Sequence, residues 1–220
     1  MPETRDKPLL IGWNRSPYAR RVAISLNLLE VPFDHEPVNA WDSYDRVLDA
    51  NPIAKVPTLI TEQGEAITES WAILDWLDHR VGPDRALMPP PPHRTEVRRL
   101  TALAGAVIDK GRELRYERHL RPARLQYSAW IARWSEQITS AMHALDTQID
   151  APFAAGDRIT QADVTIFVMV ESIRSNHQDL MRPGKFPELV ALHRDLAKID
   201  AFAKAAREDP PPGSKAVGNL

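Results

Sequence analysis

The stretch that decides the fold is NPIAKVPTLITEQGEAITESWAILDWL, residues 51–77. Its pattern predicts a loop, a short strand at 58–60, a tight turn, a second short strand and a helix. Pro57 stands at the start of the first strand, where a residue without a backbone N–H is tolerated. X-Pro bonds are the ones that can be cis. A cis Val56–Pro57 bond would turn the backbone of Val56 outward, where an extended peptide could pair with it as an added strand.

The helix at the end of this stretch begins with polar residues. We expect Thr68 to be its N-cap, which puts Glu69 and Ser70 in the first turn. Free N–H groups and the helix dipole attract a carboxylate there, and the acidic side chain of Glu69 could pair with an ammonium. A small peptide with a free amino acid end would fit these features. The alternative is an ordinary hairpin followed by a capped helix.

Composition bounds the class of protein. At 220 residues the chain can bury a core as one large or two small domains. A net charge of -2 does not indicate nucleic acid or an anionic membrane as a partner. No apolar run approaches the roughly 18 residues of a membrane span, and the charged N-terminus does not resemble a signal peptide. These features predict a soluble cytoplasmic protein.

Two residue types limit the chemistry. The chain has no cysteine, which removes disulfides, thiolate ligands and cysteine nucleophiles. The seven histidines are scattered without the spacing of metal ligands, so we expect no metal site.

The first third of the chain has the element order of a thioredoxin-like domain. Residues 7–13 predict a buried strand. Ser16 before Pro17 is typical of a helix start, with serine as N-cap and proline at the first helical position. Residues 33–38 predict a second strand, and 39–50 an irregular helix. Together with residues 51–77 the order is β-α-β followed by β-β-α.

The rest of the chain is predicted to be helical. Consecutive prolines at 89–92 cannot continue a helix and suit a semi-rigid linker. Helical spacing of apolar residues predicts long helices over 93–120 and 122–149, a buried helix after residue 163, and one or two helices over 186–206. Thr160 and Asp163 have the spacing of a capping box in front of the buried helix. The predicted organisation is a thioredoxin-like domain over 1–84, a proline-rich linker over 85–92, an all-helical domain over 93–208 and a flexible tail over 209–220.

The segment Lys55-Val56-Pro57-Thr58-Leu59, followed by Glu69-Ser70, resembles the glutathione-binding half of the glutathione transferase family. The Thr160-x-x-Asp163 motif resembles the N-capping box of the same family's helical domain. The resemblance covers nearly the whole chain. It implies an α/β thioredoxin-like N-terminal domain, an all-α C-terminal helical bundle and a homodimer.

The resemblance also assigns glutathione-binding roles. Val56, next to Pro57, would pair with the cysteinyl backbone of glutathione. Glu69 and Ser70 would hold its γ-glutamyl end, and Lys55 would reach its glycyl carboxylate.

Ser16 is the predicted catalytic residue, because Ser-Pro-aromatic at 16–18 resembles the serine type of the family. A free thiol has a pKa near ~8.5, and a donated hydrogen bond together with a helix N-terminus would lower it. Tyr18 and Asn14 are rival hydrogen-bond donors to the sulfur. The alternative is that Ser16 only caps its helix.

The implied function is that of a glutathione transferase, which stabilises the thiolate of glutathione and directs it at a small electrophile held between the domains. Arginines of the 93–120 helix would favour an acidic substrate, or they form a solvated helix face. The alternatives are a glutathione-dependent isomerase, dehalogenase or peroxidase, a ligand carrier, and a non-catalytic binding or scaffold protein.

Overall fold

The computed structural model describes residues 4–149 and 152–208; the predicted tail at 209–220 lies outside them. The chain divides into two compact units. The first contains described residues 4–87 and 199–208, and the second contains the described residues of 88–198. The limits of the functional domains remain a prediction. By contacts, however, residues 199–208, which the sequence analysis assigned to the helical domain, group with the first unit.

A four-stranded mixed sheet forms the centre of the first unit, with the strand order β2-β1-β3-β4. Its strands are β1 (Leu9–Ile11), β2 (Asp34–Glu36), β3 (Thr58–Ile60) and β4 (Ala66–Thr68). β1 is parallel to β2 and antiparallel to β3, which is antiparallel to β4. Leu10 lies opposite Leu59 on the two central strands, and both are fully buried. β1 and β2 are shorter than the strands predicted at 7–13 and 33–38, because only three residues of each pair with the other, whereas β3 has the predicted bounds of 58–60.

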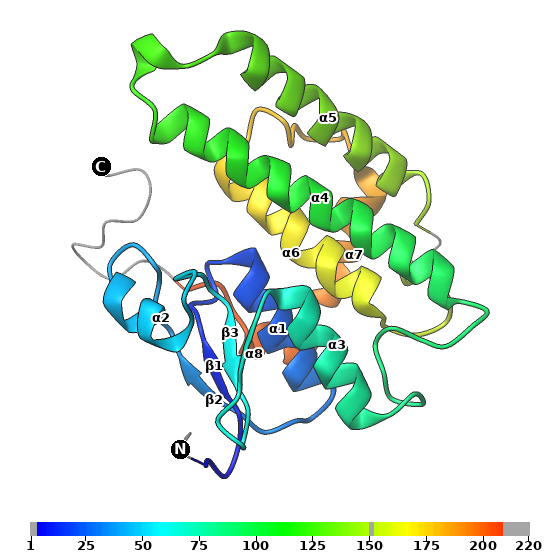
Figure 1. The fold of residues 1–220 in the computed structure, drawn as a ribbon. Helices are drawn as coiled ribbons and strands as arrows, with labels where there is room; N and C mark the ends of the chain where they lie inside the picture. Colours follow the sequence, from blue (N-terminus) through cyan, green and yellow to red (C-terminus); the bar gives the residue numbers. More distant parts are fainter. Residues whose placement is uncertain (1–3, 150–151, 209–220) are drawn as a thin grey trace. The chain divides into compact units, whose positions relative to one another are not determined.

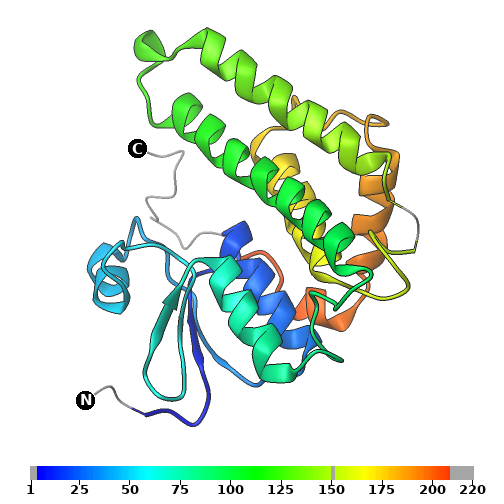
Figure 2. The same ribbon diagram turned by 45° about the vertical axis from the view of Figure 1, so that its right-hand side comes forward.

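Helices cover this sheet. α1 (Pro17–Leu28) and α3 (Ser70–Val81) pack against each other on one side of the sheet, and α2 (Tyr44–Ala50) lies on the other side (Figures 1 and 2). The short helix α8 (Asp200–Lys204) packs against α1. This arrangement is thioredoxin-like. The expected N-cap at Thr68 is wrong: Thr68 ends β4, and Glu69 occupies the N-cap position of α3 with φ of 67°.

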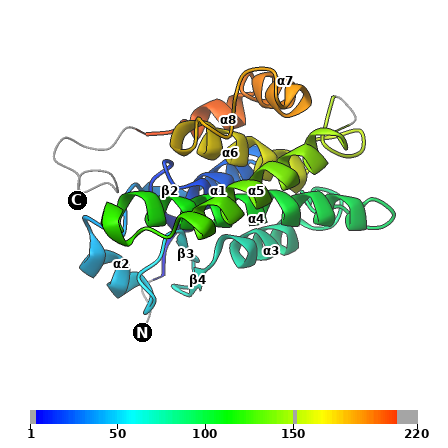
Figure 3. The ribbon, with the colours of Figure 1, turned by 90° about the horizontal axis from the view of Figure 1, so that it is seen from above.

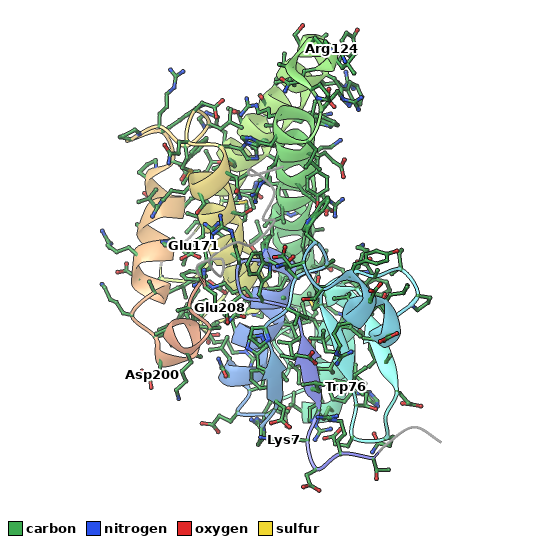
Figure 4. The ribbon with its side chains drawn as sticks, turned by 90° about the vertical axis from the view of Figure 1, so that its left-hand side faces the viewer. Lys7, Trp76, Arg124, Glu171, Asp200 and Glu208 are labelled. Carbon is green, nitrogen blue, oxygen red and sulfur yellow. The ribbon has the colours of Figure 1, made fainter. Side chains whose placement is uncertain are left out.

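The second unit is all-helical. It contains α4 (Arg94–His119), the 3₁₀ turn η1 (Ala123–Leu125), α5 (Ser128–Asp146), α6 (Gln161–Asn176) and α7 (Pro187–Leu196). α4 lies alongside both α5 and α6 (Figures 1 and 3). Figure 4 labels Arg124 in η1, at the connection of α4 to α5. The second long helix therefore starts at Ser128 instead of residue 122, because η1 occupies the residues after Pro122.

The predicted capping box of α6 is confirmed. The Thr160 N–H donates to Asp163 Oδ2 at 2.8 Å, and the Ala162 N–H donates to Thr160 Oγ1 at 3.3 Å. Asp163 is fully buried and also accepts from the Ala154 N–H at 2.7 Å. Burial raises the pKa of Asp163, although these hydrogen bonds oppose the shift. Thr160 and Asp163 therefore have a structural role at the start of the central helix.

Two kinds of feature are absent from the described residues. No helix there is long and apolar enough to cross a membrane. No group of three or more acidic or histidine side chains there could hold a metal ion.

Candidate functional site

One buried side chain holds the loop in front of β3. Asn51 is 3% exposed, and its Nδ2 donates to the Lys55 carbonyl at 2.9 Å and to Thr58 Oγ1. Its Oδ1 accepts from the Ile53 N–H at 3.1 Å. The loop that carries Lys55 and Val56 is therefore fixed from inside the first unit.

The backbone of Val56 forms a free edge. The Val56–Pro57 bond is cis, and Pro57 is buried at the entrance to β3. Within residues 4–149 and 152–208, neither the N–H nor the C=O of Val56 has a hydrogen-bond partner. An extended peptide can therefore pair with Val56 as a further strand would.

Gly12 brings this edge close to the start of α1. It follows β1 with φ of 137°, a region that favours glycine. A Cβ added there would lie 3.0 Å from the Val56 Cβ and 3.1 Å from the Ala19 Cβ. The close approach of Val56 to the first turn of α1 therefore needs a glycine. In the sequence analysis Gly12 was only a residue of the first strand, because the approach of Val56 leaves no local signal.

Ser16 is the N-cap of α1, as predicted, with Pro17 as the first helical residue. Its Oγ accepts from the Ala19 N–H at 3.4 Å. No acceptor among the described residues takes the hydroxyl proton of Ser16. Because a serine hydroxyl can accept and donate at once, Ser16 can cap the helix and still donate to a sulfur atom. The half-buried Tyr18 lies in the first turn of the same helix.

Asn14 contacts the last of the described residues, Glu208. Its N–H donates to Glu208 Oε2 at 3.2 Å, and Glu208 lies near α1 in Figure 4. Asn14 is 5% exposed, and its Oδ1 is buried without a hydrogen-bond partner in the part of the chain that the structure describes. The sequence analysis missed Glu208, because it is 194 positions away from Asn14.

Two further hydrogen bonds attach the segment 199–208 to α1. Arg20 Nε donates to the Ala205 carbonyl at 2.7 Å, and Asn27 Nδ2 donates to the Ala201 carbonyl at 3.1 Å. Burial and the nearby Arg207 lower the pKa of Arg20 to about 10. The segment therefore runs antiparallel to α1 and reaches the loop that carries Ser16.

The N-terminus of α3 presents charged and polar groups. Glu69 does not cap the helix with its side chain, which forms an ion pair with Lys55. Ser70, the first helical residue, is 2% exposed. Its Oγ accepts hydrogen bonds from Nε and Nη2 of Arg21, at 3.0 and 2.7 Å. The sequence analysis missed Arg21, because nothing in the sequence near it indicates that this arginine is buried.

These contacts connect the predicted residues of the first unit. Lys55 touches Glu69, which precedes Ser70, and Val56 reaches the first turn of α1 beside Ser16. The capping residues Thr160 and Asp163 belong to the second unit.

Two arginines of α4 are held in ion pairs and do not identify a substrate. Arg112 is paired with Asp109 and Glu113, and Arg118 is paired with Asp179. Both members of each ion pair belong to the second unit.

Known proteins match both halves of the chain. Residues 10–85 match the family model "Glutathione S-transferase, N-terminal domain", and residues 128–205 match "Glutathione S-transferase, C-terminal domain". A maleylpyruvate isomerase from Ralstonia sp. is 30% identical over 90% of this chain and 95% of its own length. A probable maleylacetoacetate isomerase from Caenorhabditis elegans is 28% identical over 94% of this chain and 97% of its own length.

A solved structure agrees with these relatives. A glutathione S-transferase from Methylobacterium radiotolerans, in complex with glutathione sulfonate, superimposes with a TM-score of 0.86. It is 28% identical, and the match covers 93% of this chain and 96% of that protein. The chain therefore belongs to the glutathione S-transferase family.

Proposed function

We propose that this protein is a glutathione-dependent enzyme that binds glutathione in its first unit and activates the thiol for attack on a small electrophile. The observation that carries the proposal is the free backbone edge of Val56, placed by Gly12 beside the N-terminus of α1. A cysteinyl residue paired with Val56 would have its sulfur near Ser16. Glutathione bound to the homologous Methylobacterium protein, as the sulfonate, supports the choice of peptide.

Each residue has a proposed role. The Val56 N–H and C=O pair with the cysteinyl backbone of glutathione. Ser70 and the first N–H groups of α3 hold the α-carboxylate of the γ-glutamyl end, and Glu69 takes its ammonium. Lys55 takes the glycyl carboxylate. Pro57 keeps its structural role at the start of β3.

Ser16 is the proposed catalytic residue. Its hydroxyl proton is available, and it stands at the N-terminus of a 12-residue helix whose dipole favours negative charge. Both features stabilise the thiolate relative to the thiol. The thiol proton leaves to solvent, and the sulfur lone pair then attacks the electrophile. Asn14 and Tyr18 remain rival donors.

The names of the relatives favour isomerisation as the reaction. A thiolate can add to the double bond of a maleyl group: the C–S bond forms, the π electron pair moves onto the conjugated carbonyl as an enolate, and the remaining C–C single bond rotates. Breaking the C–S bond then restores the double bond in the trans form and releases glutathione unchanged. In conjugation the C–S bond instead stays and a leaving group departs. Both reactions need the same thiolate.

Three assays separate these activities. They follow isomerisation of maleylpyruvate, conjugation of chlorodinitrobenzene and reduction of an organic hydroperoxide, each with reduced glutathione. We expect isomerisation to be the fastest, and Ser16→Ala to slow it. Faster turnover of chlorodinitrobenzene would point to a transferase, and faster hydroperoxide reduction to a peroxidase. Glutathione binding without turnover would favour a scaffold, although a scaffold has no need to keep Ser16, Val56, Glu69 and Ser70 together.

The assembly and location are part of the same proposal. We propose a homodimer, supported by the resemblance and by apolar surface on each unit. Trp71 on α3 is 68% exposed. A groove of about 460 Å³ on α4 and α5 is lined by apolar residues such as Ala106 and Ile138 together with polar ones such as Lys110 and Glu136. Light scattering that gives the mass of one 24.8 kDa chain would contradict the dimer. The proposed location is the cytoplasm, where the glutathione pool is kept reduced.

A further inference from the structure

The hydroxyl group of Ser70 has an unusual set of partners. Ser70 begins α3 and is 2% exposed, and Arg21 lies on α1 and is 8% exposed. Arg21 donates to Ser70 Oγ twice, from Nε at 3.0 Å and from Nη2 at 2.7 Å. The packing of α1 against α3 holds both side chains in place.

These two hydrogen bonds limit the further hydrogen bonds that the Ser70 hydroxyl can form. A serine hydroxyl has two acceptor positions and one donor proton. The guanidinium of Arg21 fills both acceptor positions, so only the proton remains. No acceptor within residues 4–149 and 152–208 takes that proton. Ser70 can therefore only donate to a further group, and the positive charge of Arg21 strengthens that hydrogen bond.

The backbone N–H groups beside Ser70 are donors as well. The first N–H groups of a helix have no intrahelical partner, and Glu69 leaves them uncapped because its side chain makes no cap hydrogen bond. The N–H groups of Ser70 and Trp71 therefore lie at the same helix end as the Ser70 hydroxyl. This end of α3 offers donors, and a group with acceptors only, such as a carboxylate, suits it.

We propose that Arg21 is a specificity-determining positioning residue, which makes Ser70 a dedicated donor so that the site selects a ligand with a free α-carboxylate. The inference rests on the proposed function, in which this ligand is the γ-glutamyl end of glutathione. A carboxamide in the same place has an NH₂ group where the carboxylate has an acceptor oxygen. Either the Ser70 hydroxyl or an N–H group at the start of α3 then has no acceptor. A site built to hydrogen-bond one group rejects an analogue that cannot complete the pairing.

Two ligands and four proteins test this proposal. Full-length protein is titrated calorimetrically with glutathione and with the analogue whose γ-glutamyl α-carboxylate is a carboxamide. We expect the wild-type protein to prefer glutathione by about 10-fold or more, as for a hydrogen bond to a charged group. Arg21→Met should weaken glutathione binding and bring the two affinities within about threefold, since charge-assisted donation by Ser70 is lost.

Arg20→Met is the matched control. Arg20 directly precedes Arg21 in α1 and is also buried, but it donates to the Ala205 carbonyl instead of Ser70. Its loss should lower the thermal midpoint and leave the ratio of the two affinities unchanged. A ratio that falls equally in both variants would show a general loss of structure and would overturn the proposal.

Arg21→Lys provides a second route if the methionine variant does not fold. Lysine keeps a buried positive charge but cannot donate two hydrogen bonds in the fixed geometry of a guanidinium. We expect the ratio to fall by at least about threefold, and an unchanged ratio overturns the role of Arg21. Wild-type protein that binds glutathione with no preference over the carboxamide overturns this inference and the proposed contact of Ser70 with the α-carboxylate, but leaves glutathione binding as such intact. Wild-type protein that binds neither compound contradicts the proposed function and the inference with it.

Discussion

The ammonium of Lys55 is paired with the carboxylate of Glu69, so two side chains proposed to hold opposite ends of glutathione neutralise each other. The two side chains are 43% and 41% exposed, and ion pairs of this kind contribute about 0–1 kcal/mol. Glutathione carries an ammonium for Glu69 and a carboxylate for Lys55. With the proposed roles, we expect binding to exchange one weak ion pair for two contacts with the ligand.

Lys55→Ala should affect two ligands in opposite directions. Glutathione should bind more weakly, by at most about fivefold, because the contact to its glycyl carboxylate is lost. Glutathione with a glycinamide end should bind more tightly, because Glu69 no longer has a competing partner. Lys7→Ala is the control, since Lys7 forms a similarly exposed pair with Asp34. Calorimetry measures both affinities, and equal changes for the two ligands would exclude the proposed role of Lys55.

Ser16→Ala should raise the pKa of the bound glutathione thiol by about 1 to 2 units, as expected for loss of a hydrogen bond to a charged sulfur. Less thiolate is then present at neutral pH, so the turnover should fall and its pH profile should move to higher pH. Ultraviolet absorbance of the thiolate against pH measures the shift.

Ser43→Ala is the control for Ser16, because Ser43 is the N-cap of α2 without a side-chain cap hydrogen bond. It should leave the thiol pKa unchanged. If Ser16→Ala also leaves it unchanged, the donor is Tyr18 or Asn14.

Phe202→Ala should destabilise the first unit by about 3–5 kcal/mol, the usual cost of removing a buried phenylalanine. Phe202 is 1% exposed on α8, in the segment that runs along α1 to the Ser16 loop. Lys204→Ala on the same helix should stay within about 0.5 kcal/mol, since its side chain is 68% exposed. Chemical denaturation compares the two variants. Equal stabilities would mean that the segment does not support the first unit.

The stability of the helical unit should fall as the pH is lowered below about 6.5, the ordinary pKa of histidine. Burial lowers the pKa of His177, which is 1% exposed, and Arg118 and Arg115 act in the same direction against the Gly111 carbonyl and Asp179. The unfolded chain therefore binds a proton that the folded chain does not. The contribution is fully present above pH 6.5 and is lost as the pH falls toward the folded pKa.

The contacts of the His177 ring explain why its pKa is lowered, and they suggest a test. His177 Nε2 lies 2.8 Å from the Gly111 carbonyl, and Nδ1 lies 3.4 Å from Arg118 Nη1. A second ring proton would therefore face the guanidinium. His177→Gln should flatten the dependence of the thermal midpoint on pH, whereas His79→Gln, at an exposed position of α3, should not. A steep dependence in the His177 variant would place its source elsewhere.

Features set by neighbouring residues could be predicted from the sequence. The N-cap at Ser16, the capping box of Thr160 and Asp163, and the loop-strand-turn-strand-helix order of residues 51–77 each depend on residues close in the chain. The error at Thr68 has a local cause as well. The positive φ of Glu69 delays the helix by one residue, and no propensity of glutamate indicates it.

Contacts between distant residues could not be predicted. Arg21 is 49 positions from Ser70, and Asn14 is 194 positions from Glu208. The importance of Gly12 depends on the approach of Val56, which only the folded sheet creates. The candidate site was therefore predictable as a set of motifs, and its supporting residues were not.

The central claim is that the first unit holds glutathione by its peptide backbone and its γ-glutamyl end. Calorimetric titration of the purified protein with reduced glutathione tests it most directly, with the normally linked α-glutamyl-cysteinyl-glycine peptide as the control. We expect glutathione to bind and the α-linked peptide to bind at least about 10-fold more weakly, because its α-carboxylate is consumed in the peptide bond. Equal binding of the two peptides, or no binding of either, would contradict the account.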